Sequence, residues 1–266
     1  MTAVEGGPGS VAVTTGAALE LDGISKSYGG LEVLRSVTLS IPSSTIYGIA
    51  GPNGAGKTTL LNIISGFADA DSGRFQVSGV DTTAMDAFRL SRMGVARTFQ
   101  NIRLFRGMSV REQVSAGAYR HRTASMFASM LRLPSERRDR AMLAETADQM
   151  LELVGLSHVA DRLAETLSYG DQRRLEIARA LATRPNVLLL DEPTAGMNDA
   201  DWLPIADLLS ELRSRGLTVV VIEHNMRLLE RCCDRIAVIA AGAVIAEDEP
   251  MACLRLPEVR VAYFGK

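Results

Sequence analysis

The fold of this 266-residue chain is decided by one stretch of sequence, Gly51-Pro52-Asn53-Gly54-Ala55-Gly56-Lys57-Thr58. It follows an apolar run of β-forming residues, 46–50, and precedes residues 59–64, whose apolar side chains are spaced as in a helix. Its glycines let backbone N–H groups turn inward, and the start of a helix carries a partial positive charge. The order strand, glycine-rich loop, helix therefore predicts a phosphate-binding loop. A flexible glycine-rich turn before a helix is the alternative.

Two side chains at the end of this loop carry the chemistry expected of a nucleotide site. Lys57 is placed to reach the β- and γ-phosphates, and Thr58 offers a hydroxyl to Mg²⁺. A side chain in place of Gly56 is expected to obstruct the inward turn of the backbone around the phosphates. The sequence thus predicts a nucleotide-binding loop made of Gly51, Pro52, Asn53, Gly54, Ala55, Gly56, Lys57, Thr58 and Thr59.

A second apolar run, residues 187–190, ends in two adjacent carboxylates, Asp191 and Glu192. Carboxylates delivered to the end of a buried strand need partners, because burying them unpaired is costly. We assign Asp191 to Mg²⁺, directly or through its water, and Glu192 to the general base that polarises an attacking water. A solvated acidic turn is the alternative.

A third string distinguishes among the classes of phosphate-loop protein: Leu167-Ser168-Tyr169-Gly170-Asp171-Gln172. Ser168 and Gly170 come just before a run with apolar residues at helical spacing and Arg and Glu between them. This pattern predicts a second anion-binding helix N-terminus. An ordinary N-capped helix is the alternative.

Taken with the other motifs, this string resembles the signature motif of ATP-binding cassette (ABC) ATPases, which usually reads Leu-Ser-Gly-Gly-Gln. Tyr169 and Asp171 depart from that pattern, whereas Ser168 and Gly170 are retained. The resemblance implies that ATP bound to the opposite subunit contacts Ser168, Tyr169, Gly170 and Asp171. It covers roughly residues 17–266, and it implies a P-loop NTPase core of the ABC ATPase type, with an antiparallel β subdomain and an inserted helical subdomain.

The resemblance also implies roles for residues outside these strings. Tyr28 matches the aromatic residue that stacks on adenine, with a core aromatic as the alternative. Gln100 matches the glutamine that contacts Mg²⁺ and the water and senses the membrane partner. His224 matches the switch histidine at the γ-phosphate, and Asn198 lies in the loop that touches the opposite subunit. The implied cofactors are ATP and Mg²⁺, the catalytic residues are Glu192, His224 and Gln100, and the Mg²⁺ ligands are Thr58, Gln100 and Asp191.

The composition of the chain limits the kinds of partner that it can bind directly, nucleic acid and the membrane among them. The chain is 47% hydrophobic and 23% charged, which is enough to bury a large core, and its net charge of −2 gives no sign of a nucleic-acid partner. The longest apolar stretch, 236–246, is interrupted by Gly242 and falls short of the roughly 20 residues that span a bilayer. It predicts two strands around a turn, so any membrane role requires a partner. The three cysteines suggest neither disulfides nor a metal site.

The chain divides into a tail and one ABC ATPase domain in this interpretation. The expected units are a disordered tail over 1–17, the ATPase domain over 18–266, its α/β core with β subdomain over 18–99 and 172–266, and the helical signature subdomain over 100–171. For the apolar segment 126–134 within that subdomain, internal packing is favoured over a surface that faces a partner or the membrane.

Four further strings are similar to the ATP-binding subunits of branched-chain amino acid importers of the LivG-like type: 97–105, 172–179, 195–198 and 257–265. That resemblance implies an ATP-hydrolysing subunit that drives uptake by ATP-driven dimer closure. The implied partners are transmembrane permease subunits, a second ABC ATPase that is identical or different and, indirectly, a substrate-binding protein, but no nucleic acid. The implied location is peripheral, at the cytoplasmic face of the inner (plasma) membrane.

Other functions stay open at this point. A related ATPase that extracts lipopolysaccharide, or one that drives urea or amide import, would use the same motifs. A soluble ABC protein of translation or DNA repair usually has a second cassette, a long coiled coil or a basic surface, and these features are absent from this sequence. For coupling to a permease, we expect Gln100 and a helical segment over 102–105 to form the wall of a groove that receives a cytoplasmic helix.

Overall fold

The computed structural model describes residues 16–121, 134–198 and 201–264. A six-stranded sheet lies at its centre, in the order β10-β9-β3-β8-β7-β6. Strands β9, β3, β8, β7 and β6 are parallel, and β10 joins the edge antiparallel to β9. The bounds are β3 Ile46–Ala50, β6 Val95–Arg97, β7 Val187–Asp191, β8 Thr218–Ile222, β9 Arg235–Ala240 and β10 Ala243–Asp248.

Strand β7 shows how this sheet separates two cores. Every residue of β7 is buried, as expected for a parallel strand covered on both faces. Because successive side chains point to opposite faces, Leu188 and Leu190 join one apolar cluster, while Val187 and Leu189 join the other. Helices α7 (Leu203–Ser214) and α8 (Met226–Cys232) contribute to the first cluster, and α1 (Lys57–Ile64) contributes to the second.

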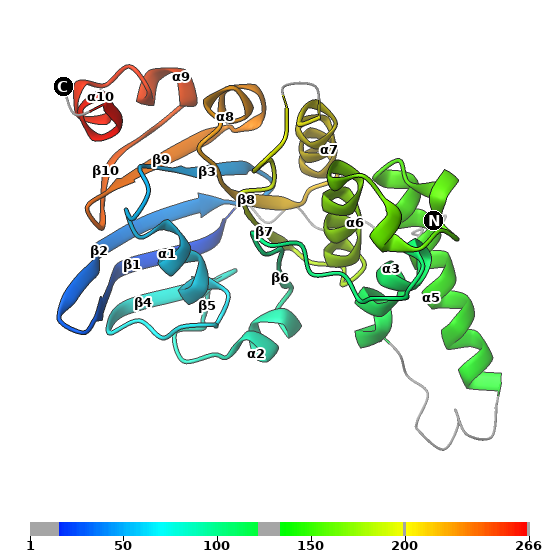
Figure 1. Ribbon diagram of the computed structural model, residues 1–266. Helices are drawn as coiled ribbons and strands as arrows, with labels where there is room; N and C mark the ends of the chain where they lie inside the picture. Colours follow the sequence, from blue (N-terminus) through cyan, green and yellow to red (C-terminus); the bar gives the residue numbers. More distant parts are fainter. Residues whose placement is uncertain (1–15, 122–133, 199–200, 265–266) are drawn as a thin grey trace, which may run out of the picture.

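A second, antiparallel sheet lies beside α1, at the lower left of Figure 1, in the order β2-β1-β4-β5. Strands β1, β2 and β4 share one apolar cluster with α1 and with β3 of the central sheet, so the two sheets and the helix between them form one body. The antiparallel β subdomain implied by the resemblance is therefore present. The bounds are β1 Ala17–Tyr28, β2 Leu31–Pro42, β4 Ser72–Val77 and β5 Val80–Asp81, with α2 (Ala87–Arg92) following them.

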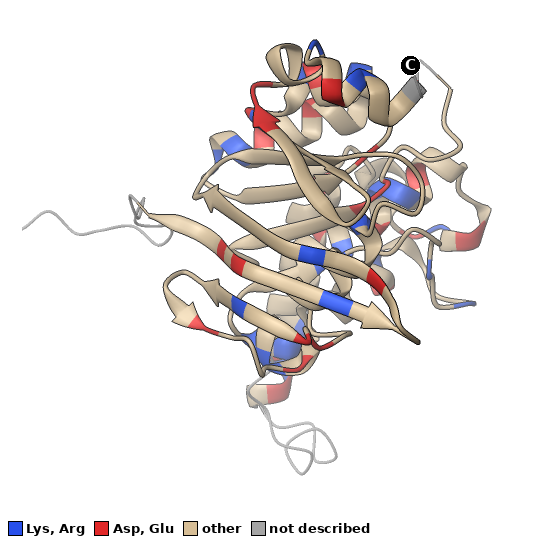
Figure 2. Ribbon diagram, turned by 90° about the vertical axis from the view of Figure 1, so that its left-hand side faces the viewer, with Lys and Arg blue, Asp and Glu red and all other residues tan. Residues whose placement is uncertain are grey.

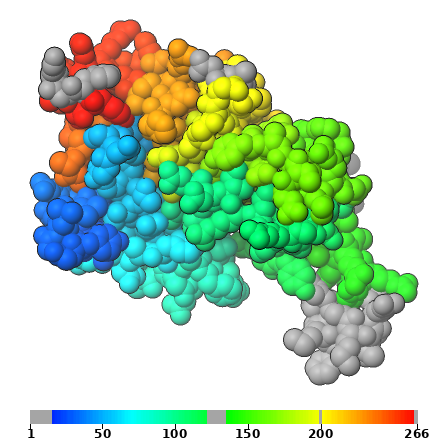
Figure 3. All heavy atoms as spheres, in the orientation of Figure 1, coloured from blue at the N-terminus to red at the C-terminus, as the bar shows by residue number. Residues whose placement is uncertain are grey.

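The helical part gathers on one side of the molecule, in green in Figures 1 and 3. It consists of α3 (Val110–Ala118), α5 (Pro134–Leu153) and α6 (Tyr169–Leu181), with short 3₁₀ turns at 119–121, 157–159 and 164–166. Helix α3 approaches α6 so closely that a Cβ at Gly117 would lie 2.1 Å from the Arg179 carbonyl oxygen. Helix α6 runs across the expected boundary at residue 172. The apolar segment 126–134 lies, up to residue 133, outside the described residues.

The secondary structure of two segments, 236–246 and 102–105, can be compared with the expectation from the sequence. The apolar stretch 236–246 is β9, a turn at Ala241 and Gly242, and β10, as predicted. The expected helix over 102–105 is wrong, because these residues form no regular structure. The Gln113 side chain accounts for this: its Nε2 donates to the Phe105 carbonyl at 2.6 Å, and its Oε1 accepts from the Phe105 N–H at 3.2 Å. Side-chain bonds thus take the place of helical ones.

The surface and the chain ends complete the description. The expected tail over 1–17 overlaps the structure at its end, because Gly16 is described and β1 begins at Ala17. After β10 the chain forms α9 (Pro250–Cys253) and α10 (Pro257–Phe264). On the face shown in Figure 2, basic and acidic residues are interspersed. No helix in the described ranges combines the length and apolar character needed to cross a bilayer.

The loop between β3 and α1 approaches neighbouring strands closely enough to require glycine. A Cβ at Gly51 would lie 2.0 Å from the Ile239 carbonyl oxygen of β9. One at Gly56 would lie 2.7 Å from both the Leu34 Cδ2 and the Val33 carbonyl oxygen of β2. Gly54 also has a positive φ, +79°, but a Cβ there meets nothing within 4 Å. A side chain at Gly56 is thus obstructed first by β2, within the protein itself.

This difference gives a prediction for two alanine variants of the loop. Gly54→Ala should cost about 1–2 kcal/mol of unfolding free energy, because an L-residue is forced into a left-handed conformation. Gly56→Ala should cost about 1–3 kcal/mol more, because the methyl group also overpacks against β2. Urea unfolding of the nucleotide-free proteins measures both values. Equal losses in the two variants would show that contact with β2 does not restrict this position.

Candidate nucleotide site

A cleft of about 800 Å³ opens above the loop between β3 and α1. It collects the predicted loop residues and three predicted catalytic side chains from separate parts of the sequence: Gln100, Glu192 and His224. Two further lining residues, Val33 and Tyr263, were not predicted. The full lining is Val33, the loop residues 51–59, Gln100, Glu192, His224 and Tyr263.

The parallel sheet explains why these residues meet. In the register of the sheet, Ile222 of β8 pairs with Ile49 of β3 on one side and with Asp191 of β7 on the other. The three strands therefore end at the same edge, where ligands bind in open α/β sheets. The Glu192 N–H donates to the Ile222 carbonyl at 3.0 Å, which continues the pairing past the end of β7.

Lys57 is held inside the loop that it follows. Its ammonium group donates to the carbonyl oxygens of Gly51 at 2.8 Å and Pro52 at 2.9 Å, and the residue is 7% exposed. Burial lowers the pKa of Lys57, and the charges of Glu192 and Asp191 oppose that shift. Since Lys57 is the first residue of α1, its charge adds to that of the helix N-terminus, an arrangement that suits a phosphate group.

Glu192 lies between the two other predicted catalytic residues. Its Oε2 accepts a hydrogen bond from Gln100 Nε2 at 2.8 Å, and its Oε1 lies 3.9 Å from His224 Nδ1. The Glu192 backbone has φ +46°, in the left-handed region that non-glycine residues rarely occupy and that is found at functional sites. The carboxylate thus faces the cleft, within reach of a water there.

Asp191 is not part of the cleft wall but lies buried behind it. The residue is 3% exposed, which excludes a solvated turn for this carboxylate. Its Oδ2 accepts from Arg97 Nη2 at 3.0 Å. Burial raises the pKa of Asp191, and Arg97 opposes the shift. No site role was expected for Arg97 from the sequence, because it lies outside the nucleotide loop, the paired carboxylates and the signature string.

The donor set fits Mg²⁺ held together with phosphate. Thr58 and Gln100 line the cleft with a hydroxyl and an amide oxygen, and the Asp191 carboxylate lies buried behind it at the end of strand β7, with Oδ2 bound to Arg97. Within the described ranges, no group of three or more His, Cys, Asp or Glu side chains could hold a metal alone. The hydroxyl and amide of the cleft wall suit Mg²⁺, which is usually held by a few protein oxygens complemented by water and substrate phosphates.

The signature residues lie apart from this cleft in the single chain. Ser168 caps α6, and its hydroxyl accepts from the Asp171 N–H at 3.2 Å. The Asp171 carboxylate forms an ion pair with Arg174 of the same helix, so this departure from the family pattern is accommodated locally. Tyr169 is 46% exposed, and a Cβ at Gly170 would meet nothing within 4 Å. The N-terminus of α6 thus presents an accessible surface.

Two aromatic residues differ in how they relate to the cleft. Tyr28 ends β1, is 49% exposed and has the Lys26 ammonium 5.4 Å from its ring centroid, so it is not a core aromatic. Its stacking on adenine stays a prediction. Tyr263 of α10 lines the cleft, and burial raises its pKa to about 12. The ring reaches the cleft only because the C-terminal helix folds back, and no local pattern signals that.

Comparisons with known proteins agree with this geometry. A family model described as ABC transporter matches residues 34–195. Among curated relatives, the branched-chain amino acid transport ATP-binding protein BraF of Pseudomonas aeruginosa is 39% identical, and LivG of Escherichia coli (strain K12) is 38% identical. Both alignments cover 93% of this chain and 98% of the relative. The lipopolysaccharide export ATP-binding protein LptB of Haemophilus influenzae is 33% identical over 93% of this chain and 97% of its own length.

Solved structures show the same architecture. The ADP conformation of an ATP-binding cassette of an ABC transporter superposes with a TM-score of 0.82 and 33% identity, covering 94% of this chain and 99% of that one. A dimeric bacterial ABC transporter cassette has a TM-score of 0.74 and 27% identity, covering 87% and 98%. The fold class and the family resemblance inferred from the sequence are confirmed, and the chain belongs to the ABC transporter family as an ABC-type ATPase.

Proposed function

We propose that this ATPase is the energy-supplying subunit of an importer for branched-chain amino acids. ATP hydrolysis by this subunit is supported by the cleft, which brings together Lys57, Gln100, Glu192 and His224. The cargo is supported by the names of two relatives that align over nearly their whole length. As a subunit of such an importer, the chain works at the cytoplasmic face of the inner membrane, bound to permease subunits that in turn receive cargo from a substrate-binding protein.

Export of lipopolysaccharide is the alternative cargo that a specific observation supports, because LptB is similar over almost the whole chain. Its identity of 33% is below the 39% of BraF, which favours the amino acid importer. Reconstitution with the permease subunits and the binding protein of a branched-chain amino acid importer distinguishes the two. Reconstituted with those subunits and the accompanying binding protein, the complex should take up labelled leucine in the presence of ATP. Release of lipopolysaccharide without leucine uptake would refute the proposed cargo.

The residues of the cleft divide the hydrolysis reaction between them. Lys57 and the backbone N–H groups of the loop hold the phosphates and offset their negative charge. Thr58, Gln100 and Asp191 would hold Mg²⁺, which would supply further charge neutralisation when bound. Glu192 takes the proton of the water that attacks the γ-phosphorus, and ADP leaves with the bridging oxygen.

Two neighbours position this general base and its water. Gln100 Nε2 already donates to one oxygen of Glu192, and His224 lies beside the other. Because Gln100 donates to Oε2, it fixes the direction in which the carboxylate points. His224 is placed to contact the γ-phosphate, as the resemblance implies.

Glu192→Gln should separate binding from hydrolysis. The amide keeps the shape of the side chain and its bond with Gln100 but cannot accept a proton, so hydrolysis should fall by about 10²- to 10⁴-fold. ATP affinity should change little, and Mg·ATP should then hold the dimer closed in size-exclusion chromatography. Glu211→Gln, in an exposed ion pair with Arg215, is the matched control. Turnover near the wild-type rate in Glu192→Gln would remove this residue from the general-base role.

Hydrolysis is proposed to require two subunits. Each chain carries one loop with Lys57 and one accessible helix N-terminus with Ser168, and the second does not line the cleft formed by the first. A two-fold pair in head-to-tail arrangement would bring each helix N-terminus onto the other chain's nucleotide. The dimeric cassette with 27% identity supports such pairing. In the importer, the second subunit is either another copy or a different ATPase.

Mixing two inactive variants tests this composite site. Lys57→Ala and Ser168→Arg should each abolish hydrolysis when alone. In a mixed dimer, the intact Lys57 of one chain faces the intact Ser168 of the other, so one working site returns. If sites act independently, an equal mixture should regain roughly a quarter of wild-type turnover, because about half of the pairs are mixed and each has one site. Full activity from a wild-type chain shown to be monomeric would refute the composite site.

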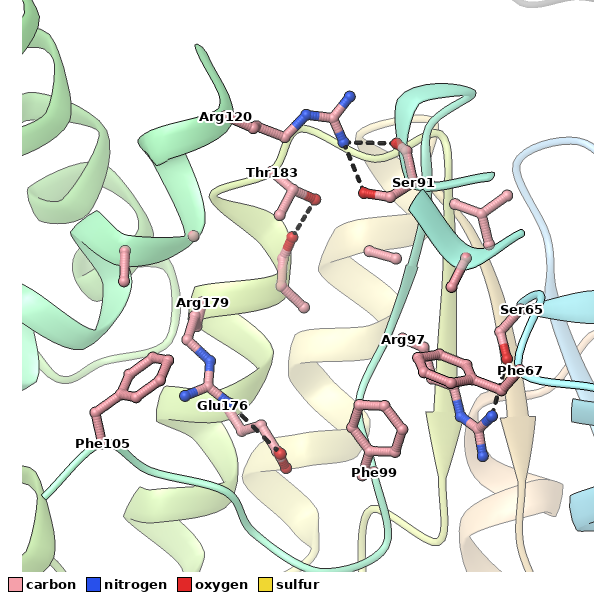
Figure 4. Close-up of a pocket in the computed structure, with 16 residues that line it drawn as sticks. Ser65, Phe67, Ser91, Arg97, Phe99, Phe105, Arg120, Glu176, Arg179 and Thr183 are labelled. Atoms are coloured by element: carbon pink, nitrogen blue, oxygen red, sulfur yellow. Dashed lines mark hydrogen bonds and ion pairs between the residues drawn. The ribbon is translucent and has the colours of Figure 1, made fainter. Parts of the chain in front are cut away.

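The permease is proposed to bind a groove of about 480 Å³ between the core and the helical part (Figure 4). Its rim includes two exposed aromatic side chains, Phe67 at 58% and Phe105 at 54% exposure. Exposed apolar clusters often mark partner sites, and a cytoplasmic helix of a permease is the proposed occupant. The sequence expectation needs adjustment here. Gln100 lines the nucleotide cleft instead of the groove, and Leu104 packs against the core.

Phe105→Ser should uncouple the ATPase from its permease. The side chain is exposed, so the isolated chain should fold and bind ATP, while assembly with the permease and leucine uptake should be lost. Phe88→Ser is the control, because Phe88 is 71% exposed on α2 but does not line the groove. Co-purification with the permease and uptake in vesicles measure the effect. Normal transport by Phe105→Ser would mean that this groove is not the docking site.

A further inference from the structure

One buried guanidinium connects three parts of the nucleotide-binding core. Arg97, the last residue of β6, has a side chain that is only 6% exposed. Its Nη1 donates to Asn62 Oδ1 and to Ser65 Oγ, both at 2.8 Å. Its Nη2 donates to Asp191 Oδ2 at 3.0 Å. The side chain thus joins the end of β6 to helix α1 and to the end of β7.

The same guanidinium also forms part of the groove. Its Cζ lies 5.0 Å from the ring centroid of Phe99 and 5.8 Å from that of Phe67, within the range of cation–π attraction. The two rings contact each other edge to face, with centroids 5.4 Å apart. Arg97, Phe67 and Phe99 all line the groove, and Figure 4 shows both rings beside the guanidinium. Arg97 therefore touches the groove wall and the buried carboxylate at once.

The fixed geometry around the Arg97 guanidinium restricts the orientation of the Asp191 carboxylate. Three hydrogen-bond acceptors and two rings surround the guanidinium, and its planar fork admits few orientations that satisfy all of them. A buried carboxylate paired with such a fork is held in one orientation. The rings in the groove and the buried carboxylate are therefore joined through one guanidinium.

We propose that Arg97 is a positioning residue that sets the Asp191 carboxylate for Mg²⁺ binding and links that carboxylate to the groove. This proposal rests on the proposed role of Asp191 in holding Mg²⁺. It assigns to Arg97, which lies outside the nucleotide loop, the paired strand-end carboxylates and the signature string, the function of connecting the occupied state of the groove to the metal site. The bond to Asp191 and the two ring contacts are the physical links.

A merely structural role for Arg97 makes a different prediction from a positioning role. A structural arginine would lower stability when replaced, without changing how folded protein binds Mg²⁺. A positioning arginine changes the Mg²⁺ dependence of nucleotide binding while leaving metal-free binding intact. The Arg97 guanidinium bonds to Asn62, Ser65 and Asp191, and not to the loop or to Lys57, which are proposed to hold the phosphates. Nucleotide binding without metal should therefore survive its replacement.

The experiment uses the full chain and a fluorescent ATP analogue. The analogue is bound first in EDTA and then titrated with MgCl₂, which gives metal-free affinity and the Mg²⁺ concentration at half effect. In Arg97→Gln, the affinity for the analogue without metal should stay within about twofold of wild type. The Mg²⁺ concentration at half effect should rise about tenfold. Arg231→Gln is the control, because Arg231 forms an exposed ion pair with Asp207 at 2.9 Å and lines neither the cleft nor the groove. An unchanged or lowered Mg²⁺ requirement in Arg97→Gln overturns the proposal.

Further variants keep the test decisive. If Arg97→Gln does not fold, Arg97→Lys decides: it keeps the charge but not the fork, and its Mg²⁺ requirement should rise about threefold or more. An unchanged requirement in folded Arg97→Lys then overturns the proposal. Phe67→Leu alters only the ring, and a rise of about two- to fivefold is expected from a lost cation–π contact. No change in Phe67→Leu overturns the link to the groove.

Asp191→Asn distinguishes failure of this inference from failure of the proposed function. If Asp191 holds Mg²⁺, its amide variant should raise the Mg²⁺ requirement at least about tenfold. A normal requirement in Asp191→Asn refutes the metal role of Asp191 and the Arg97 proposal with it. A raised requirement in Asp191→Asn alongside normal Arg97 variants refutes only the positioning role.

Discussion

The parallel register of β3, β8 and β7 is the constraint on which the rest of this structure depends. Because Ile222 pairs with both Ile49 and Asp191, the three strands end at one edge. The loop that carries Lys57 and the turn that carries Glu192 are consequently neighbours, although far apart in the chain. All three strands are buried along their length, so burial of their apolar side chains on both faces of the sheet maintains the register and with it the site.

Two buried arginines connect this edge to the helical part. Arg97 joins Asp191 to the aromatic wall of the groove. Arg173 of α6 is 0% exposed and donates to the carbonyl oxygens of Phe99 at 2.7 Å and Gln100 at 2.6 Å. The segment between β6 and the helical part is thus held from both sides by guanidinium groups. Charged side chains are costly to bury, and here the Arg97 guanidinium is paired with Asp191 and that of Arg173 with Glu176 and two backbone carbonyls, which leaves only the Nε atom of each without a hydrogen-bond partner in the described ranges.

Much of the site could be predicted because its chemistry requires particular residues at fixed spacing. Gly51, Lys57 and Thr58 belong to one short loop, and Asp191 and Glu192 end one apolar strand, so local pattern was enough to assign them. Arg97 and Tyr263 were missed since each reaches the site by a contact distant in sequence. The helix expected over 102–105 was wrong for a related reason: Gln113, eight residues further on, takes the hydrogen bonds of the Phe105 backbone.

The sequence by itself predicted the nucleotide loop from the local spacing of glycine, apolar and charged residues, and the resemblance of its motifs to those of ABC ATPases indicated the class of fold and the family. Only the tertiary structure decided that Gly56 is restricted by β2, that Asp191 is paired with Arg97, and that Ser168 lies away from the cleft of its own chain. These facts depend on which side chains approach across strands and helices that are distant in sequence. The packing of two apolar cores on the two faces of one sheet determines which of these side chains meet, and no short stretch of residues is enough to predict it.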